Sequence, residues 1–454
     1  MNPDTDTIAA VATAPGESAI AIIRVSGPAS LPIADRIFSC VGAPASQRAS
    51  NSFVHGRIMS KDGVADEVIL LIYRAPHSYT REDSIEIQGH GGSSAAKRIL
   101  RSVLEAGARP AEPGEFTKRA FLNGRIDLLQ AEAVLDLIRA RSDRAATAAL
   151  EQLSGRLSDS FGKAYDEILA TAADLEATLD FSEDELPPTL LNGIISRLQQ
   201  GEQHLQGLLD TWDEGHLLRE GALIVISGKP NVGKSTLLNA LLGIDRAIVT
   251  PIPGTTRDTI EESLVIDGVS VRLVDTAGLR DTDCAIEGEG IRRTRSALEK
   301  ADLILYLIDG SQTVDPDDLE QVKAIPPKKT VILVNKSDLP KKANISAMTD
   351  RSVIFISLRT GDDIPLVKKI ISEKISAHCT AQPHAVISER HRIIVLSSLK
   401  EVTEAKRLLQ QDQPETALAA SSLRASLESL GEATGRVYHD ELLNSIFSRF
   451  CIGK

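Results

Sequence analysis

An eight-residue run in the middle of the chain has the residue types and spacing of a phosphate-binding loop. Residues 228–235, GKPNVGKS, fit the pattern GxxxxGK[ST], with an apolar run before them and a helix-forming run after them. The glycines allow backbone N–H groups to curl around phosphates, and the following helix N-terminus adds positive potential. Lys234 would pair with the β- and γ-phosphates, and Ser235 would ligate Mg²⁺. The run therefore predicts a nucleoside triphosphate site.

Two later motifs predict that this nucleotide is GTP. Residues 275–278, DTAG, follow an apolar run, where a second Mg²⁺-associated carboxylate and a glycine that senses the γ-phosphate are expected. Residues 335–338, NKSD, follow another apolar run, at the sheet edge where nucleotides bind. Asp338 can accept both the N1–H and the 2-amino hydrogens of guanine, a donor pair that adenine lacks. Between the motifs, the loop GTTRD at 254–258 is suited to closing over the γ-phosphate. Ser357-Leu358 stands where many GTPases have Ser-Ala.

The group that orients the attacking water is not identified by spacing. Many small GTPases place a glutamine shortly after the DxxG motif, but this chain has Leu279 directly after it, which cannot form a hydrogen bond. A catalytic carboxylate must therefore come from elsewhere, and several acidic residues follow closely: Asp281, Asp283, Glu287 and Glu289. For any one of them, a solvated surface carboxylate is the competing interpretation.

Composition indicates an ordinary globular protein. The 454 residues are 42% hydrophobic and 25% charged, and no run approaches the roughly 20 apolar residues of a membrane span. The N-terminus lacks the features of a signal peptide, and the four cysteines lie far apart, so we expect a reducing cytoplasm and no membrane. A net charge of −12 excludes global attraction to nucleic acid. Residues 97–125 are locally basic, which fits an RNA contact or a solvated helix face equally well.

The first 120 residues predict an α+β domain, and helices follow. Strand-like runs cover residues 19–25, 68–73 and 84–87, and a helical pattern covers 95–106. Apolar residues then recur every three or four positions from Leu150 to Leu179, which predicts one long amphipathic helix. Pro187-Pro188 ends this pattern, and a second helix is expected through residues 198–209.

Residues 220–380 alternate short apolar runs with helical segments. The runs at 223–226, 269–274, 303–308, 331–334 and 353–356 predict a mainly parallel sheet with helices on both faces. The pattern is helical again from about residue 386. Two helical pieces around an α/β domain indicate one helical domain interrupted by an insertion. The expected domains are residues 1–120, 121–215, 216–380 and 381–454.

The whole chain resembles the bacterial tRNA modification GTPase family MnmE, also called TrmE. The resemblance covers essentially the full length and is carried by IIRVSG at 22–27, IQGHGG at 87–92, RPAEPGEFTKRAFLNGRIDLLQAEAVLDLI at 109–138, LLREG at 217–221, GTTRD at 254–258, DTAGLR at 275–280 and FCIGK at 450–454. It implies a multidomain α/β protein with an N-terminal α+β folate-binding and dimerisation domain, a discontinuous all-α helical domain, and an inserted P-loop, Ras-like α/β G domain.

The resemblance also implies a reaction and its partners. Members are homodimers that join a FAD-dependent partner, MnmG, in a heterotetramer and act on tRNA. Together they add a carboxymethylaminomethyl-type group to carbon 5 of the wobble uridine. The one-carbon donor is 5-formyl- or methylenetetrahydrofolate, and the residues that match the family's folate contacts are Arg24, Glu86, Arg125 and Lys454. Arg125 replaces a lysine found in some members, which keeps the charge but alters its geometry.

In this family potassium stands in for an arginine finger when the G domains pair. Asn231 matches the side-chain K⁺ ligand, and backbone oxygens of Thr250, Ile252 and Thr255 complete that site. Thr256 matches the second Mg²⁺ ligand, and Glu287 matches the catalytic carboxylate that positions water. The GTP-binding residues expected in all are Asn231, Val232, Gly233, Lys234, Ser235, Thr236, Thr250, Pro251, Ile252, Pro253, Gly254, Thr255, Thr256, Asp275, Thr276, Ala277, Gly278, Asn335, Lys336, Ser337, Asp338 and Ser357.

Two questions have more than one answer at this point. Cys451 is either a packed structural thiol, which we favour, or a residue of the modification site, which its place in the family suggests. The chain is either a tRNA-modifying GTPase or, alternatively, a regulatory GTPase of ribosome assembly without modification chemistry, because GTTRD-type G domains also occur there. The QGHGG region and the CIGK tail favour tRNA modification.

Overall fold

The computed structural model describes residues 6–178, 188–243, 261–275, 295–348, 350–376 and 386–454. The chain forms two compact units. One comprises Met1–Leu135, Ser158–Ile194 and Glu404–Lys454, and the other comprises Asp136–Leu157 and Ile195–Thr403. Helices and sheets together form the expected multidomain architecture, whereas the four domain boundaries remain a prediction. Among the described residues, no helix is long and apolar enough to cross a membrane.

The first unit contains a seven-stranded sheet. Its strand order is β3 (Phe38–Ser39), β4 (Ser52–Ser60), β5 (Gly63–Tyr73), β6 (Ser84–His90), β2 (Ile20–Ser26), β1 (Ile8–Val11) and β7 (Arg109–Pro110). Neighbouring strands are antiparallel, except for the parallel pair β1 and β7. The expected strands in this region are confirmed as parts of β2, β5 and β6.

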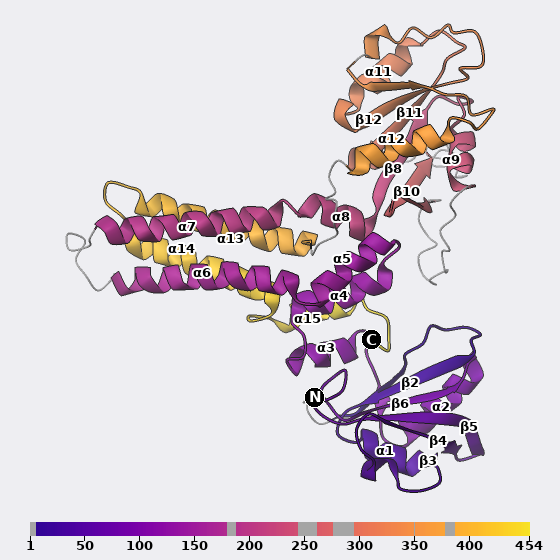
Figure 1. Ribbon diagram of the computed structural model, residues 1–454, viewed down its shortest axis with the longest axis vertical. Coiled ribbons are helices and arrows are strands. Elements are labelled where there is room, and N and C mark those ends of the chain that lie inside the picture. Colours follow the sequence, from indigo (N-terminus) through magenta and orange to yellow (C-terminus); the bar gives the residue numbers. More distant parts are fainter. Residues whose placement is uncertain (1–5, 179–187, 244–260, 276–294, 349, 377–385) are drawn as a thin grey trace, which may run out of the picture. The chain divides into compact units, whose positions relative to one another are not determined.

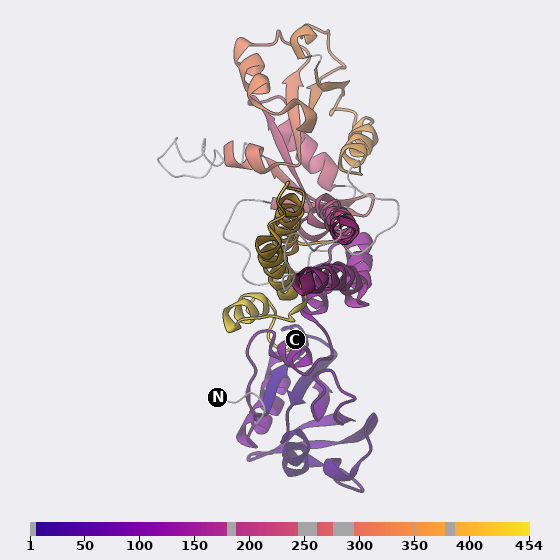
Figure 2. The same cartoon turned by 90° about the vertical axis from the view of Figure 1, so that its left-hand side faces the viewer.

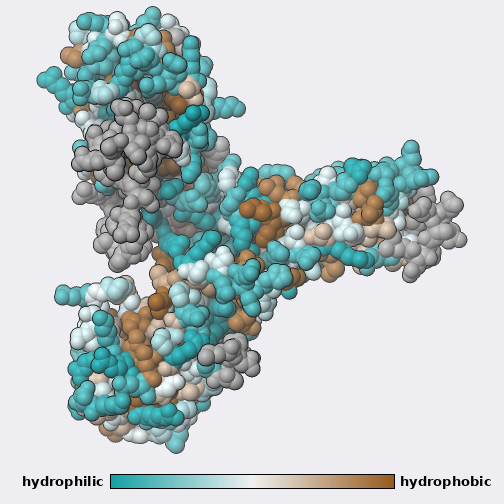
Figure 3. Space-filling view, turned by 180° about the vertical axis from the view of Figure 1, so that it is seen from behind, coloured by the Kyte–Doolittle hydropathy of each residue, from teal (hydrophilic) through white to brown (hydrophobic). Residues whose placement is uncertain are grey.

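Helices α1 (Ser30–Ile37) and α2 (Ser93–Glu105) cover one face of this sheet (Figure 1). Because side chains alternate along a strand, Ile23 and Ile87 are buried beneath these helices while Arg24 and Glu86 lie on the opposite face. That opposite face also keeps large apolar side chains exposed on β2, β4 and β5: Ile20, Phe53 and Ile69. Figure 3 shows hydrophobic patches on the surface of this part of the protein.

The C-terminal end of the chain packs on helices that follow the sheet in sequence. These are α3 (Glu115–Leu122) and α4 (Leu128–Arg139), and their partner is α15 (Asp440–Phe447). The shared core consists of Phe121, Leu128, Ala131, Leu135, Leu443, Ile446, Phe447 and Phe450. Figures 1 and 2 both show the C-terminal residues beside these helices. Helix α14 (Thr416–Thr434) precedes α15.

The single long helix expected from Leu150 to Leu179 is wrong in one respect, because two helices carry that stripe. Helix α5 (Asp143–Leu153) ends before α6 (Arg156–Thr178) begins. Gly155 lies between them with φ of 98°, a left-handed conformation that glycine adopts without a steric penalty. Leu150 is 52% exposed and so is not part of the buried stripe. The next helix, α7 (Pro188–Leu209), begins at a proline, as first helical positions often do.

The second unit contains a six-stranded sheet that confirms the predicted α/β pattern. Its order is β13 (Ser352–Phe355), β12 (Thr330–Asn335), β11 (Leu303–Asp309), β8 (Ala222–Gly228), β10 (Val269–Asp275) and β9 (Glu261–Ile266). All neighbours are parallel except β9 and β10. Helices α9 (Lys234–Leu242) and α12 (Ile364–Ser376) pack in the core on one face, and α11 (Pro316–Ala324) packs in the core on the other. The edge strand β9 has no counterpart among the predicted runs.

Helix α8 (Trp212–Glu220) leads into this sheet, and α13 (Glu389–Leu409) follows it. Arg219, near the end of α8, joins the segment that leads into the sheet to the segment that precedes α13. Its Nη1 donates to the carbonyl of Ile387 at 2.7 Å, and its Nη2 donates to that of Val386 at 2.8 Å. The same guanidinium also binds Asp136 on α4 at 2.6 Å and Gln152 on α5 at 2.9 Å. The chain therefore passes the same arginine on its way into the sheet and on its way out.

Candidate functional site

The phosphate-binding loop lies between β8 and α9, as its sequence predicts. Gly228 ends the strand with φ of 138°, and a Cβ atom there would lie 2.4 Å from the carbonyl oxygen of Leu307. Gly233 caps α9 with φ of 107°, and a Cβ atom there would lie 2.5 Å from Nδ2 of Asn335. Both positions therefore require glycine, because any side chain would strain the backbone and collide with a neighbour.

Lys234 is the buried lysine of the loop. Its residue is only 7% exposed, and its Nζ donates to the carbonyl oxygens of Gly228 at 2.9 Å and Lys229 at 2.8 Å. An ammonium held by neutral carbonyls can exchange them for phosphate oxygens, which form stronger charge-assisted hydrogen bonds. Val232 of this loop is buried, whereas Asn231, with φ of 63°, and Thr236 on α9 are exposed.

Ser235 and Asp275 provide adjacent oxygen ligands beside this loop. Because β8 and β10 are parallel neighbours, the start of α9 lies close to the carboxyl end of β10. Ser235 Oγ donates to Asp275 Oδ2 at 3.2 Å. A hydroxyl and a carboxylate are hard oxygen donors of the kind that Mg²⁺ prefers beside substrate phosphates. These two residues therefore fit the expected magnesium site.

At the other end of the site, Asn335 joins two loops. It is 4% exposed, donates from Nδ2 to the carbonyl of Val232 at 2.8 Å, and accepts at Oδ1 from the N–H of Leu358 at 3.1 Å. Ser337 donates its N–H to the carbonyl of Ile356 at 3.1 Å. Asn335 thus fixes the phosphate loop against the loop that carries Ser357.

Asp338 is held in orientation by Ser357. Ser357 Oγ donates to Oδ1 of Asp338 at 2.8 Å, and the second carboxylate oxygen lies 3.8 Å from the guanidinium of Arg359. The Asp338 side chain is 27% exposed, so this carboxylate remains open to a ligand. A fixed carboxylate can accept the paired N1–H and 2-amino hydrogens of guanine, which is the recognition that the NKSD motif predicts.

One residue of this region was missed from the sequence. Asp309 ends β11, and its carboxylate accepts from Lys336 Nζ at 2.6 Å and from Ser311 Oγ at 2.6 Å. Burial alone would raise the pKa of Asp309, but the hydrogen bonds from Lys336 and Ser311 outweigh it and lower the pKa. Its position after a buried strand, at the carboxyl edge of the sheet, was the available signal.

Eleven predicted residues of this site lie outside the described part of the chain. They are Thr250, Pro251, Ile252, Pro253, Gly254, Thr255, Thr256, Thr276, Ala277, Gly278 and the predicted catalytic residue Glu287. The K⁺ ligands other than Asn231 and the second Mg²⁺ ligand are among them, so these assignments remain predictions.

The four residues predicted to contact folate gather around the N-terminal sheet and the C-terminal tail. Arg24 on β2 stands directly opposite Glu86 on β6, and its Nε donates to Oε1 of Glu86 at 2.9 Å. The Arg24 guanidinium also lies 5.7 Å from the ring centre of Phe116 on α3. The N–H of Phe116 donates to the carbonyl oxygen of Lys454 at 3.2 Å, which seats the tail beside this cluster.

The tail is fixed by its backbone. Ile452 forms an isolated β-bridge with Pro113. Gly453 has φ of 96°, and a Cβ atom there would lie 2.5 Å from the carbonyl oxygen of Val11. The preference for a packed thiol at Cys451 is wrong, because this residue is exposed. Its backbone carbonyl accepts from the N–H of Gly114 at 3.5 Å, while the residue as a whole stays exposed.

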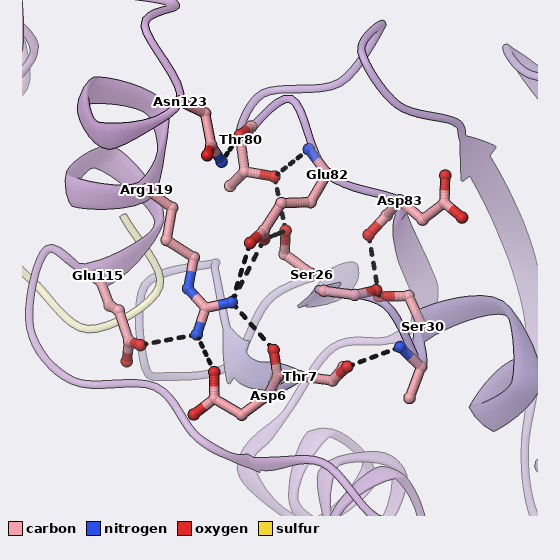
Figure 4. A network of polar contacts seen from close by, with 12 residues as sticks. Asp6, Thr7, Ser26, Ser30, Thr80, Glu82, Asp83, Glu115, Arg119 and Asn123 are labelled. Carbon is pink, nitrogen blue, oxygen red and sulfur yellow. Dashed lines mark hydrogen bonds and ion pairs between the residues drawn. The ribbon is translucent and has the colours of Figure 1, made fainter. Parts of the chain in front are cut away.

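A buried ionic network lies beneath this cluster (Figure 4). The side chain of Arg119, 4% exposed, binds Asp6 at 2.6 Å, Glu115 at 3.0 Å and Glu82 at 3.1 Å. Arg109 binds both Asp6 and Glu115. Neither interpretation of the basic stretch 97–125 therefore describes Arg119, because its charge is neutralised inside the protein rather than offered to RNA or to solvent. Arg109 is partly exposed, and its charge is paired with Asp6 and Glu115.

Comparison with known proteins places the chain in a family. It matches the family models described as the MnmE helical domain, over residues 128–451, and the GTP-binding protein TrmE N-terminus, over residues 7–125. It is 40% identical to the tRNA modification GTPase MnmE of Alkaliphilus oremlandii and 42% identical to that of Geobacter sulfurreducens, in each case over 99% of both chains. Among solved structures, the G domain of the T. maritima FeoB iron transporter is 26% identical over 35% of this chain and 99% of that one, with a TM-score of 0.25. The motifs, the two sheets and these full-length matches agree, and the chain belongs to the tRNA modification GTPase MnmE family.

Proposed function

We propose that this protein is a potassium-activated GTPase that takes part in modifying carbon 5 of the wobble uridine of certain tRNAs. With a FAD-dependent MnmG partner, it adds a carboxymethylaminomethyl-type group whose one-carbon unit comes from 5-formyl- or methylenetetrahydrofolate. The observation that carries the GTPase part is the arrangement of three features at one sheet edge. These are Lys234 inside the phosphate loop, the adjacent oxygens of Ser235 and Asp275, and Asp338 oriented by Ser357.

Each residue has a separate task in GTP hydrolysis. Lys234 binds phosphate oxygens and compensates their charge, and Asp338 selects guanine. Ser235, Asp275 and Thr256 hold Mg²⁺, which supplies charge stabilisation to the transferred phosphoryl group when bound. Asn231 supplies a side-chain oxygen to K⁺, together with the backbone of Thr250, Ile252 and Thr255. Glu287 orients water, a role that Leu279 cannot fill.

The N-terminal cluster supports the folate part of the proposal. Arg24 and Glu86 lie on the sheet face that the helices leave open. Arg24 lies near the rings of Tyr79 and Phe116; Arg125 stacks on the ring of Tyr79, and the carbonyl oxygen of Lys454 accepts from the N–H of Phe116. A carboxylate and guanidinium groups beside aromatic rings suit a pteridine, which is flat and hydrogen-bonding, with an anionic tail. Cys451, exposed on the tail, is a candidate residue of the modification site.

A homodimer in the cytoplasm is the proposed state of the protein. The exposed apolar side chains Ile20, Phe53 and Ile69 on the open sheet face support self-association, because such a patch is costly to leave in water. We further propose that this dimer binds MnmG as a heterotetramer and receives tRNA there.

Cation dependence tests the GTPase mechanism. We expect potassium to accelerate GTP hydrolysis markedly over sodium, because no glutamine follows the DxxG motif. Asn231→Ala should remove that difference with GTP affinity nearly unchanged, and Glu287→Ala should bind GTP normally but lose roughly 10²-fold or more in kcat. Asp338→Asn is the control, because it should weaken guanine binding itself. Equal rates of the parent protein in both salts would refute the potassium assignment.

Analysis of wobble uridines separates tRNA modification from ribosome assembly. In a strain that lacks this protein, mass spectrometry of tRNA nucleosides should show loss of the substituted methyl group on uridine. Re-expression of the parent protein should restore it, and re-expression of Glu287→Ala should not. Intact modification together with defective ribosomal subunits in the deletion strain would favour the regulatory alternative instead.

A further inference from the structure

Tyr79 lies between the two arginines that are expected to contact folate. Its ring centre is 5.3 Å from the guanidinium carbon of Arg24 and 4.6 Å from that of Arg125. The carbonyl oxygen of Tyr79 also accepts from Nη1 of Arg125 at 2.9 Å, and its hydroxyl lies 3.0 Å from Oγ1 of Thr117 on α3. The ring belongs to the same apolar cluster as Phe116. Tyr79 thus contacts a residue of β2, a residue of α3 and a residue of the segment after α3.

The two arginines differ in charge balance. Arg24 is paired with Glu86, at 2.8 Å between Nη2 and Oε1, so its positive charge is largely compensated. Within the described part of the chain, Arg125 has no carboxylate partner, and its contacts are the ring and the carbonyl oxygen of Tyr79. Arg125 is also exposed. A ligand carboxylate is therefore better received by Arg125 than by Arg24, where it would face Glu86.

The buried network fixes the segment that carries Tyr79 (Figure 4). Thr80 Oγ1 lies 2.6 Å from Ser26 Oγ, and its carbonyl accepts from Nδ2 of Asn123 at 2.7 Å. Two residues further on, Glu82 binds the buried Arg119. Because these neighbours are anchored, the backbone at Tyr79 is fixed, and its ring presents one defined surface on which Arg125 stacks.

We propose that Tyr79 is a positioning residue that holds the guanidinium of Arg125 ready for a ligand carboxylate. The ligand class is a reduced pteridine with an anionic tail, and its tail lies on Arg125 rather than on Arg24. This inference rests on the proposed folate function and adds to it the orientation of the ligand. An arginine held by a ring face and a carbonyl loses less conformational freedom on binding than a free one, which raises affinity.

The test compares two ligands that differ only in tail charge. Calorimetric titration of the full-length protein uses 5-formyltetrahydrofolate and its glutamate diamide, which has the same shape and a neutral tail. The parent protein should prefer the acid. Tyr79→Leu should weaken acid binding by about 3- to 10-fold, the range of a cation–π contact, and leave diamide binding within about twofold. Tyr79→Phe, which keeps the ring, should retain the preference.

Three further variants make the result specific. Tyr165→Leu removes a ring on α6 that stacks on Arg436 at 4.3 Å and has no part in the contacts of Arg125, so it should leave both affinities unchanged. Arg125→Gln should also remove the preference for the acid, and Tyr79→Leu in that background should add little, because the two side chains act through one contact. Arg125→Gln leaves Tyr79 in place, so it tests the carboxylate contact also in the case in which Tyr79→Leu is poorly folded.

Three results would overturn the inference. Equal weakening of acid and diamide by Tyr79→Leu would show a merely structural role. Equal binding of both ligands by the parent protein would show that no carboxylate is received at Arg125. Binding of neither ligand by the parent protein would refute the folate function itself, and the inference with it.

Discussion

Glu115 shows how a buried carboxylate can be kept charged by its neighbours. It is nearly covered, yet it accepts from Arg109 at 2.8 Å, from Arg119 at 3.0 Å and from the N–H of Glu112 at 2.8 Å. Burial alone would raise the pKa of Glu115, but these hydrogen bonds outweigh it and hold the pKa below its ordinary value. The same balance lowers the pKa of Asp6.

The stability of the N-terminal sheet should therefore depend on pH through Glu115. A carboxyl group whose pKa is lowered by folding stabilises the fold above its ordinary pKa, and that stabilisation is lost as the pH falls through the folded value. Glu115→Gln should lower the free energy of unfolding by about 1.5–3 kcal/mol at pH 7, and the difference from the parent protein should shrink as the pH falls below about 4.5. Urea titrations read by hydrogen exchange of peptides from β1 and α3 measure it.

Glu112→Gln serves as the matched control for this experiment, because Glu112 is an exposed neighbour in the same turn. Its unfolding free energy should follow that of the parent protein at every pH. A Glu115→Gln difference that stays constant from pH 7 to pH 3 would contradict the role given to the network.

The residues found from the sequence are those whose chemistry is local. Lys234, Ser235 and Asp338 belong to short motifs that can be recognised from the sequence, and their roles in binding GTP and Mg²⁺ stay predictions. Asp309 and Tyr79 were missed because their partners come from distant elements. The partner of Asp309 is Lys336, which follows a neighbouring strand. The partners of Tyr79 are Arg24, on β2, and Arg125, after α3, and each is more than 40 residues away in the sequence. Tertiary partners of this kind leave no fixed spacing to recognise.

At the scale of elements, long apolar runs were predicted well and half-buried ones poorly. β11 and β12 are buried on both faces, so their runs of apolar residues are unmistakable. β4 carries exposed residues at alternate positions and β1 spans only four residues, and neither was predicted. The break between α5 and α6 was missed because Gly155 stops the helix without interrupting the spacing of apolar residues. A helix end that depends on the backbone conformation of one glycine does not change the pattern of apolar residues, so that pattern could not predict it.

At the scale of the whole molecule, the two chemistries should be separable. The core on each face of the six-stranded sheet is formed almost wholly within residues 215–381. A fragment of about those residues should therefore fold, bind GTP and respond to potassium. It should not bind 5-formyltetrahydrofolate, because Arg24, Glu86, Arg125 and Lys454 lie outside it.

Calorimetric titration of GTP and of the folate into the fragment and into the full chain measures both activities. The full chain should bind both ligands. Equal folate binding by the fragment would overturn the N-terminal assignment and leave the GTPase proposal standing. Loss of GTP binding in the fragment would instead show that the sheet depends on the helices around it.

Arg219 holds together, by hydrogen bonds, the two places where the chain enters and leaves the six-stranded sheet. By joining α8 to the carbonyls of Val386 and Ile387, it closes the whole intervening segment into a loop. The entropy lost in closing a flexible loop grows only with the logarithm of its length, so that each doubling costs roughly 0.6 kcal/mol. The surface loops of the segment between α8 and Val386 can therefore become longer or shorter with little effect on the stability of the helices before and after it. The hydrogen bonds of a single guanidinium let one folding unit be carried inside another.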